Sequence, residues 1–163
     1  MVRFLPAVVS TALLLGCHRA ELPEATNAGA ALEAAALARG LVRDPALVDP
    51  VGAFAGETDR VCIVPREDGY TIGAAVDYGE GQGCVARGTA QGRAKLEVRL
   101  SEDCRFTAAL DGDRIVFPAL LPAGCDRTCR GRASLSTLSA ERLSASEAEA
   151  RSLPAPDGQV LCG

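Results

Sequence analysis

The sequence predicts a mainly β fold: a small antiparallel β-barrel or curled sheet held by disulfides, preceded by an Ala-rich helix and followed by a short C-terminal helix. From residue 60 onward, apolar and polar side chains alternate with period two between turn dipeptides, which is typical of half-buried antiparallel strands. The chain has seven cysteines, and setting aside the one near its start leaves an even number for disulfides.

The strands are expected in a continuous meander. Alternation is clearest where Leu96, Val98 and Leu100 interleave with charged residues. Tyr70, Ile72 and the apolar residues at every second position after them also share one face. The expected strands cover residues 60–65, 70–78, 83–90, 95–100, 104–110 and 114–117, with turns at 68–69, 91–92, 101–103 and 111–112.

The end of the chain is predicted in less regular pieces. Residues 125–132 resemble a cross-linked loop, and residues 133–138 fit both helical and strand spacing, of which we favour the strand. The segment Ser144-Ala-Ser-Glu147 has the form of a capping box and predicts a short helix to about Arg151, ended near Pro154. Residues 160–162 are expected to close the structure as a terminal strand.

Before the barrel, an Ala-rich run over residues 30–41 predicts a helix that Thr26 or Asn27 caps and Gly40 ends. Pro45 and Pro50 bracket a linker after it. Three regions follow: a signal segment over residues 1–16, a tether with its helix over 17–56, and a disulfide-stapled β domain over 57–163.

Residues 1–16 have the features of a secretory signal, because Arg3 precedes an apolar run that ends at Leu15. The run is shorter than the ~20 apolar residues that a membrane-spanning helix needs. An ordinary secretory signal that contains a cysteine is the alternative to what the next residues suggest.

The sequence Leu14-Leu15-Gly16-Cys17 resembles the lipobox of bacterial lipoproteins. This resemblance implies cleavage before Cys17, lipid on Cys17, and a membrane anchor of two or more acyl chains. His18, in the place where Asp favours inner-membrane retention, implies the outer membrane, with the protein facing the periplasm. Cleavage removes Arg3 and no acidic residue, so the formal charge of −4 becomes −5, which offers no footprint for nucleic acid.

The cysteines after Cys17 are expected to form three disulfides in an oxidising compartment. These would support the core of a chain in which only 4% of residues are aromatic. Fifteen pairings exist for six cysteines, of which we favour Cys84–Cys104, Cys62–Cys162 and Cys125–Cys129. A metal or redox site at Cys125-x-x-x-Cys129 is the alternative for that pair.

No catalytic signature stands out. The one histidine is His18, so no Ser-His-Asp or Cys-His arrangement can form in the β domain, and we expect no metal or cofactor. The glycine-rich residues 79–84 lack phosphate-loop spacing and read as a mobile hairpin loop. Asp77, Tyr78 and Glu80 beside it are the candidate binding loop. The alternatives for its carboxylates are solvated turn residues or a carboxylate acid–base pair.

The arginines at 127, 130 and 132 form a local basic loop, read as a solvated surface or as a contact for an anionic glycan or lipid. The body resembles small Gram-negative envelope lipoproteins without an assigned activity. We therefore expect a non-catalytic, lipid-anchored structural or protein-binding module whose partners are the membrane and an envelope protein. The alternative is an inhibitor of an envelope-targeting enzyme, since anchor, size and terminal disulfide resemble membrane-bound lysozyme inhibitors, although that family's inhibitory loop is absent. A carboxylate enzyme ranks last.

Overall fold

The computed structural model describes residues 24–41, 44 and 47–163, which fall into two compact units, 1–41 and 42–163. The expected signal segment and Cys17 lie outside the described residues. In the first unit, α1 (Glu24–Ala38) confirms the Ala-rich helix, but the expected caps Thr26 and Asn27 are wrong because the helix begins before them. Gly40 ends it at φ 65°, and the Leu41 N–H donates to the Ala36 carbonyl at 2.9 Å, as in a glycine C-cap. No helix in the described part of the chain is long and apolar enough to span a membrane.

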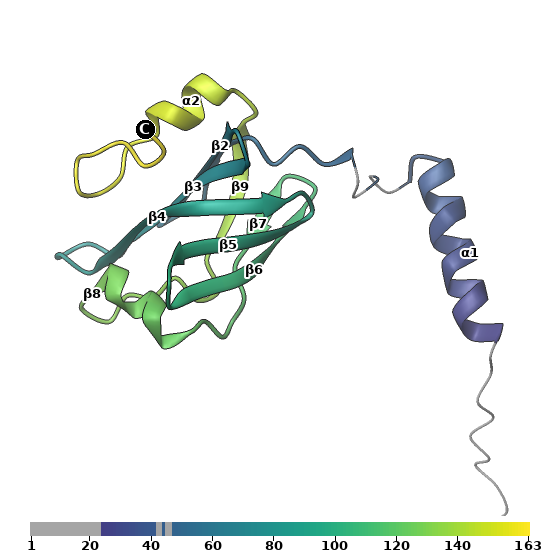
Figure 1. The fold of residues 1–163 in the computed structure, drawn as a ribbon, viewed down its shortest axis with the longest axis horizontal. Helices are drawn as coiled ribbons and strands as arrows, with labels where there is room; N and C mark the ends of the chain where they lie inside the picture. The colour runs from purple at the N-terminus through teal and green to yellow at the C-terminus, as the bar shows by residue number, and fades with distance from the viewer. Residues whose placement is uncertain (1–23, 42–43, 45–46) are drawn as a thin grey trace, which may run out of the picture. The chain divides into compact units, whose positions relative to one another are not determined.

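The second unit is a closed eight-stranded antiparallel β-barrel (Figure 1), which confirms the predicted fold class. The strands pair in the order β3-β2-β1-β9-β7-β6-β5-β4, and β3 pairs with β4 to close the ring, while the two-residue β8 pairs with β4 outside it. Their bounds are β1 (Gly52–Ala55), β2 (Asp59–Arg66), β3 (Gly69–Asp77), β4 (Gly83–Gly92), β5 (Lys95–Ser101), β6 (Cys104–Asp111), β7 (Arg114–Val116), β8 (Cys129–Arg130) and β9 (Ser139–Ser144).

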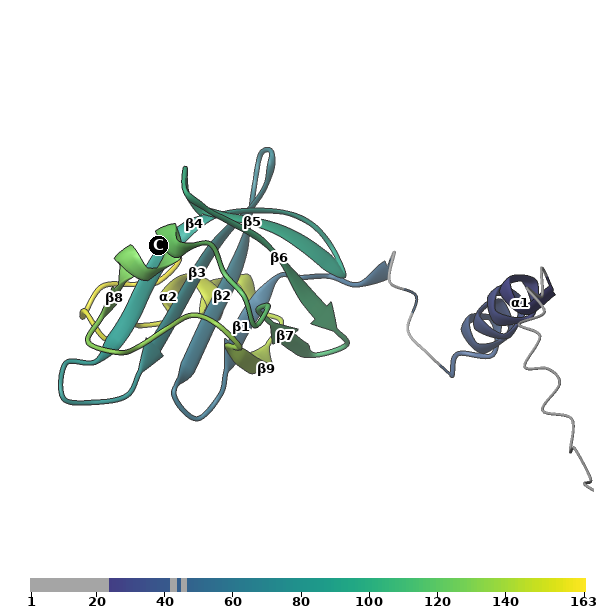
Figure 2. The same cartoon turned by 90° about the horizontal axis from the view of Figure 1, so that it is seen from below.

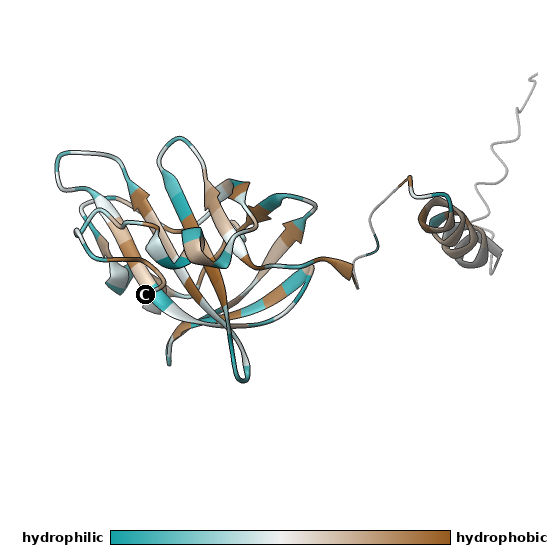
Figure 3. Ribbon diagram, turned by 90° about the horizontal axis from the view of Figure 1, so that it is seen from above, coloured by the Kyte–Doolittle hydropathy of each residue, from teal (hydrophilic) through white to brown (hydrophobic). Residues whose placement is uncertain are grey.

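Alternating side chains fill the barrel interior. In β5 the odd positions Lys95, Glu97 and Arg99 are exposed, whereas Leu96 and Val98 are buried, and Figure 3 shows such alternating hydropathy along the strands. The largest fully buried side chains include Phe54, Phe117, Ile63, Ile72, Leu96 and Ile115. Because these residues occupy the interior, the barrel is a packed core.

A second, smaller core lies on the outside of the barrel, where α2 (Glu147–Ser152) packs against β1 and β2 (Figures 1 and 2). Its buried members are Ala53, Cys62, Val64, Ala75, Ala150, Ala155, Leu161 and Cys162. The helix confirms the prediction, but its cap is Ser146, whose side chain accepts from the Glu149 N–H at 3.4 Å. Ser144 instead accepts from the Ser146 N–H at 3.0 Å.

One expected boundary and two expected strands are wrong. The tether does not reach residue 56, because residues 52–55 form β1, which lies in the barrel wall between β2 and β9. The sequence did not indicate this strand because four residues are too few to show alternation. Residues 133–138 form no strand: Thr137 takes a φ of 59°, Leu135 and Leu138 are buried, and the strand follows as β9. Residues 160–162 contribute only the single bridge Pro154–Val160.

The two ends of the barrel differ. At the entry end, which is formed by the start of β1 and the turns at 67–68, 93–94 and 112–113, the chain joins the barrel. At the opposite end, here called the cleft end, lie the β1–β2, β3–β4 and β5–β6 turns and the 3-10 helix η2 (Ala123–Thr128). Figure 1 shows the β3–β4 hairpin and η2 away from the point where residues 47–51 join β1.

Two arginines hold the incoming chain at the entry end, and Arg93 donates to the Val48 carbonyl at 3.2 Å. The Arg142 guanidinium lies 4.6 Å from the centre of the Phe54 ring and donates to the carbonyl oxygens of Val51 at 2.5 Å and Asp49 at 2.8 Å. It also donates to the Asp113 carboxylate at 3.1 Å. These bonds hold residues 49–51 at the entry end, so Arg142, together with Arg93, fixes where the chain enters the barrel.

Candidate functional site

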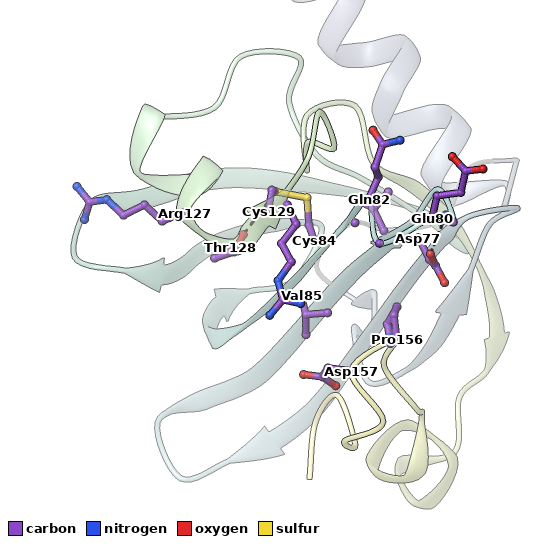
Figure 4. Close-up of a pocket in the computed structure, with 15 residues that line it drawn as sticks. Asp77, Glu80, Gln82, Cys84, Val85, Arg127, Thr128, Cys129, Pro156 and Asp157 are labelled. Carbon is purple, nitrogen blue, oxygen red and sulfur yellow. Dashed lines mark hydrogen bonds between the residues drawn. A yellow bond between two sulfur atoms is a disulfide. The ribbon is translucent and has the colours of Figure 1, made fainter.

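A cleft of about 580 Å³ lies at the cleft end (Figure 4). Its walls come from three segments that are far apart in the sequence: the β3–β4 hairpin, residues 127–130 around β8, and residues 156–157 near the C-terminus. A second hollow of about 290 Å³ shares Asp77 and Pro156 with it and adds Glu57, Thr58 and Arg60. The two hollows therefore adjoin at Asp77.

The hairpin tip is an ordered turn. The Tyr78 N–H donates to the Gln82 carbonyl and the Gln82 N–H to the Gly79 carbonyl, both at 2.9 Å. The Asp77 carboxylate accepts from the Gly79 N–H at 2.9 Å. Glu80 has a φ of 52° between two glycines that also have positive φ, a conformation that glycine adopts without a steric cost.

The structure places the predicted binding-loop residues differently. Asp77 and Glu80 line the cleft, and Figure 4 shows both carboxylates on the same side of it. Tyr78 does not line the cleft, and it is 54% exposed at the tip. The hairpin lies where the sequence predicts it, but the structure divides its candidate residues between a cleft wall and an exposed aromatic side chain.

The floor of the cleft is the outer face of β3, β4 and β8. Cys84 and Cys129 are paired directly and point into the core, so their neighbours in sequence face outward. Asp77 pairs with Gly83, and Gly83 pairs with Arg130, which places an acid, a glycine and an arginine in one row. A Cβ on Gly83 would lie 2.5 Å from the Val76 carbonyl oxygen, so this position requires glycine unless the backbone shifts.

The sequence groups the arginines at 127, 130 and 132 into one basic loop, whereas the structure gives each of them different surroundings. The Arg127 guanidinium contacts the Asp103 carboxylate at 2.8 Å. Arg130 lines the cleft and has no ion-pair partner within the described ranges. Arg132 is exposed and does not line the cleft. What separates the three arginines is the pairing of β8 with β4, which places Arg130 beside Gly83. No pattern in the sequence indicates this pairing.

All six cysteines of the barrel are in disulfides, Cys62–Cys162, Cys84–Cys129 and Cys104–Cys125. The first confirms the prediction, and the expected pairs Cys84–Cys104 and Cys125–Cys129 are wrong. The β4–β5 turn lies at residues 93–94, later than expected. The end of β4, from Thr89 to Gly92, pairs with β5, whereas its start, Gly83 and Cys84, pairs with β8. Cys84 therefore lies opposite Cys129, while η2 brings Cys125 to Cys104.

Residues 154–161 form a strap that bounds the cleft and is held by one ion pair. Arg87 donates to the two Asp157 carboxylate oxygens at 3.1–3.2 Å and to the Val160 carbonyl at 3.2 Å. The Gln159 N–H donates to Asp157 at 3.0 Å. The Gln159 hydrogen bond, followed by Arg87, lowers the pKa of Asp157 below its ordinary value.

Acid should therefore loosen the strap. A lowered pKa means that folding favours the ionised carboxylate, so its contribution is present above the ordinary value of about 4 and is lost as pH falls through the folded-state pKa. We expect the Gln159 amide NMR signal to titrate with a midpoint below that ordinary value, and amide exchange in residues 158–161 to accelerate beneath it. Asp157→Asn should remove the titration, whereas Asp126→Asn should not. A midpoint at or above the ordinary value would contradict this assignment.

The fold and the site together define a class: a small, closed antiparallel barrel with three disulfides, a packed interior and a polar cleft on its outer face. In comparisons with known proteins, no family model, curated protein or solved structure matches the chain. The described residues hold no group of three or more His, Cys, Asp or Glu side chains arranged to bind a metal.

Proposed function

We propose that this protein is a non-catalytic, lipid-anchored module of the bacterial cell envelope that binds another envelope component. The observation that carries the proposal is the set of three disulfides, which uses every cysteine after Cys17. Such bonds persist in oxidising compartments such as the periplasm. They leave Cys17, at the end of the lipobox-like segment, as the cysteine for the lipid anchor, and His18 after it favours the outer membrane.

The barrel architecture supports binding at its surface. Buried side chains occupy the interior, so a ligand would contact the outside, where the cleft and Tyr78 lie at one end. The anchored segment joins the barrel at the opposite, entry end. A partner approaching the cleft end would therefore meet the turns, η2 and the strap rather than the point where the tether joins.

The anchor is tested by intact mass and fractionation of the protein from its host membranes. We expect a chain that starts at Cys17 and carries two or three acyl groups, with six further thiols that appear only after reduction. The Cys17→Ser variant should move from the membrane to the soluble periplasmic fraction, because it lacks the acyl chains and stable anchoring needs at least two membrane-binding groups. An unlipidated wild-type chain, or free thiols before reduction, would contradict the proposal.

Binding is tested in the same cells with a photo-crosslinking residue. Placed at Tyr78, at the cleft end, it should capture a defined envelope protein. Placed at Arg66, which is exposed at the entry end of β2, it should not capture that protein. Equal capture from both positions would show that the cleft end is not the binding surface.

A second candidate function follows from the shape of the hairpin tip. Tyr78 is more than half exposed beside Glu80 at the tip of a β-hairpin, and an aromatic side chain at such a tip can enter the cleft of another protein. An inhibitor of an envelope-targeting enzyme fits this arrangement. Loss of lysozyme activity on mixing, restored by Tyr78→Ala, would favour it over the first function.

A further inference from the structure

We propose that the cleft binds a short extended peptide that carries both a cationic group and a carboxylate, with the carboxylate at Arg130 and the cation at Asp77 and Glu80. The inference rests on the proposed binding function and names the ligand class for the same end of the barrel. Four features of the cleft carry it: the spacing of its charged walls, its unpaired charges, the glycine in the middle of the row, and the apolar side chains of Val85 and Pro156 in its lining.

The spacing matches a peptide of a few residues. Asp77, Gly83 and Arg130 lie in one row across β3, β4 and β8, and neighbouring strands are about 4.8 Å apart. The acid and the arginine are thus separated by two strand spacings, about 10 Å. An extended chain advances about 3.3–3.6 Å per residue, so about three residues span this distance.

The charges available to a ligand lie on opposite sides. Arg127 is matched by Asp103 and Arg87 by Asp157, whereas Arg130 and Glu80 have no ion-pair partner among the residues described. A guanidinium binds a carboxylate through two parallel hydrogen bonds. Arg130 is therefore the anchor for a carboxylate, and the Asp77 and Glu80 wall is the anchor for an ammonium group.

Gly83 and two apolar residues line the cleft between the charged walls. Gly83, the middle residue of the row, lines the cleft and carries no side chain that could reach toward either wall. Val85, which is half-buried, and Pro156 add apolar surface to the lining. Small apolar side chains of a peptide can pack there while its two ends reach the charged walls.

The mixture of charges selects a zwitterion rather than a polyanion. An anionic glycan or lipid headgroup would gain from Arg130 and Arg127, but it would also face the carboxylates of Asp77, Glu80 and Asp157. The negative charges of such a ligand would be repelled by these carboxylates. A peptide with one charge of each sign avoids this repulsion and uses both walls.

The test is an NMR titration of the whole secreted chain carrying Cys17→Ser, labelled with ¹⁵N. The probes are tri-alanine, N-acetyl-tri-alanine and tri-alanine amide. Tri-alanine should shift the amide signals of residues 79–85 and 128–131. Each capped peptide lacks one charge and should bind at least tenfold more weakly, a difference of about 1.4 kcal/mol. Capped and uncapped peptides that bind equally, or no shift with tri-alanine, would overturn the inference.

Variants assign each wall to one end of the peptide. Arg130→Gln should weaken tri-alanine binding about tenfold and leave the affinity for tri-alanine amide unchanged. The double variant Asp77→Asn/Glu80→Gln should weaken tri-alanine binding and leave the affinity for the N-acetyl form unchanged. Asn at 77 keeps an oxygen for the Gly79 N–H, so the turn is preserved, and unchanged melting temperatures verify folding.

Arg132→Gln is the matched control, because Arg132 is exposed near β8 but does not line the cleft. It should bind tri-alanine as the unaltered chain does, and a loss equal to that of Arg130→Gln would overturn the assignment. If no tripeptide binds while the Tyr78 crosslinker still captures its envelope protein, the peptide inference fails and the proposed function stands. If neither occurs, both fail.

Discussion

Replacing Cys62 and Cys162 with alanine should lower the free energy of unfolding by about 4–5 kcal/mol, because the bond closes a loop of 100 residues and a long loop gains most from cross-linking. The same pair joins β2 to the last turn of the chain and lies within the outer core. Its loss should therefore also release the C-terminal segment. Urea denaturation of the oxidised variant measures the first effect, and limited proteolysis of residues 153–163 measures the second.

The matched comparison is the double variant Cys104→Ala/Cys125→Ala. This disulfide spans only 21 residues, and its removal should cost about 3 kcal/mol by the same chain-entropy estimate. It should leave the C-terminal segment protected. If removing Cys104–Cys125 destabilises the protein more than removing Cys62–Cys162, loop length is not what sets the contribution of these bonds.

Replacing Arg142 with methionine should destabilise the barrel by roughly 2–4 kcal/mol. Methionine keeps an unbranched stem over Phe54 but removes the guanidinium and its hydrogen bonds to Asp49, Val51 and Asp113. Hydrogen bonds from a charged donor are worth about 1.5–3 kcal/mol, and the Arg142 side chain is only 13% exposed. Urea denaturation gives the free energy of unfolding, and proteolysis at residues 47–51 shows whether this segment has detached from the entry end.

Arg114→Met is the control for charge. Arg114 pairs with Glu141 on the same sheet, but its side chain is 59% exposed, and exposed ion pairs contribute about 0–1 kcal/mol. Arg142→Lys keeps the positive charge near Phe54 without the planar fork and should fall between the two. Equal effects of Arg142→Met and Arg114→Met would show that the entry end is not held by Arg142.

These two sets of contacts give the ends of the barrel separate roles. Arg142 and residues 49–51 fasten the entry end, where the tether joins. The Cys62–Cys162 bond and the Arg87–Asp157 pair fasten the strap that bounds the cleft. Variants in the first group should alter stability with little change at the cleft, whereas variants in the strap should change peptide binding as well.

The sequence alone determined the elements whose evidence is local. Alternation in β5 and β6 predicted which side chains point inward, because successive residues of a strand face opposite sides. The even number of cysteines predicted three disulfides, and the expected pairing of Cys62 with Cys162 is confirmed. The hairpin that carries Asp77 and Glu80 was also located, since a glycine-rich break between two strands marks a turn.

Only the tertiary structure decided what depends on how strands meet. β1 is too short to carry a pattern, and its place between β2 and β9 follows from barrel closure. The pairing of Cys84 with Cys129 depends on a change of partner along β4, which pairs with β8 at residues 83–84 and with β5 only from Thr89 onward. The same change places Arg130 in a row with Gly83 and Asp77 and so creates the cleft. Periodicity records the direction of a side chain within its own strand, but register and partner choice are set by contacts between residues far apart in the chain.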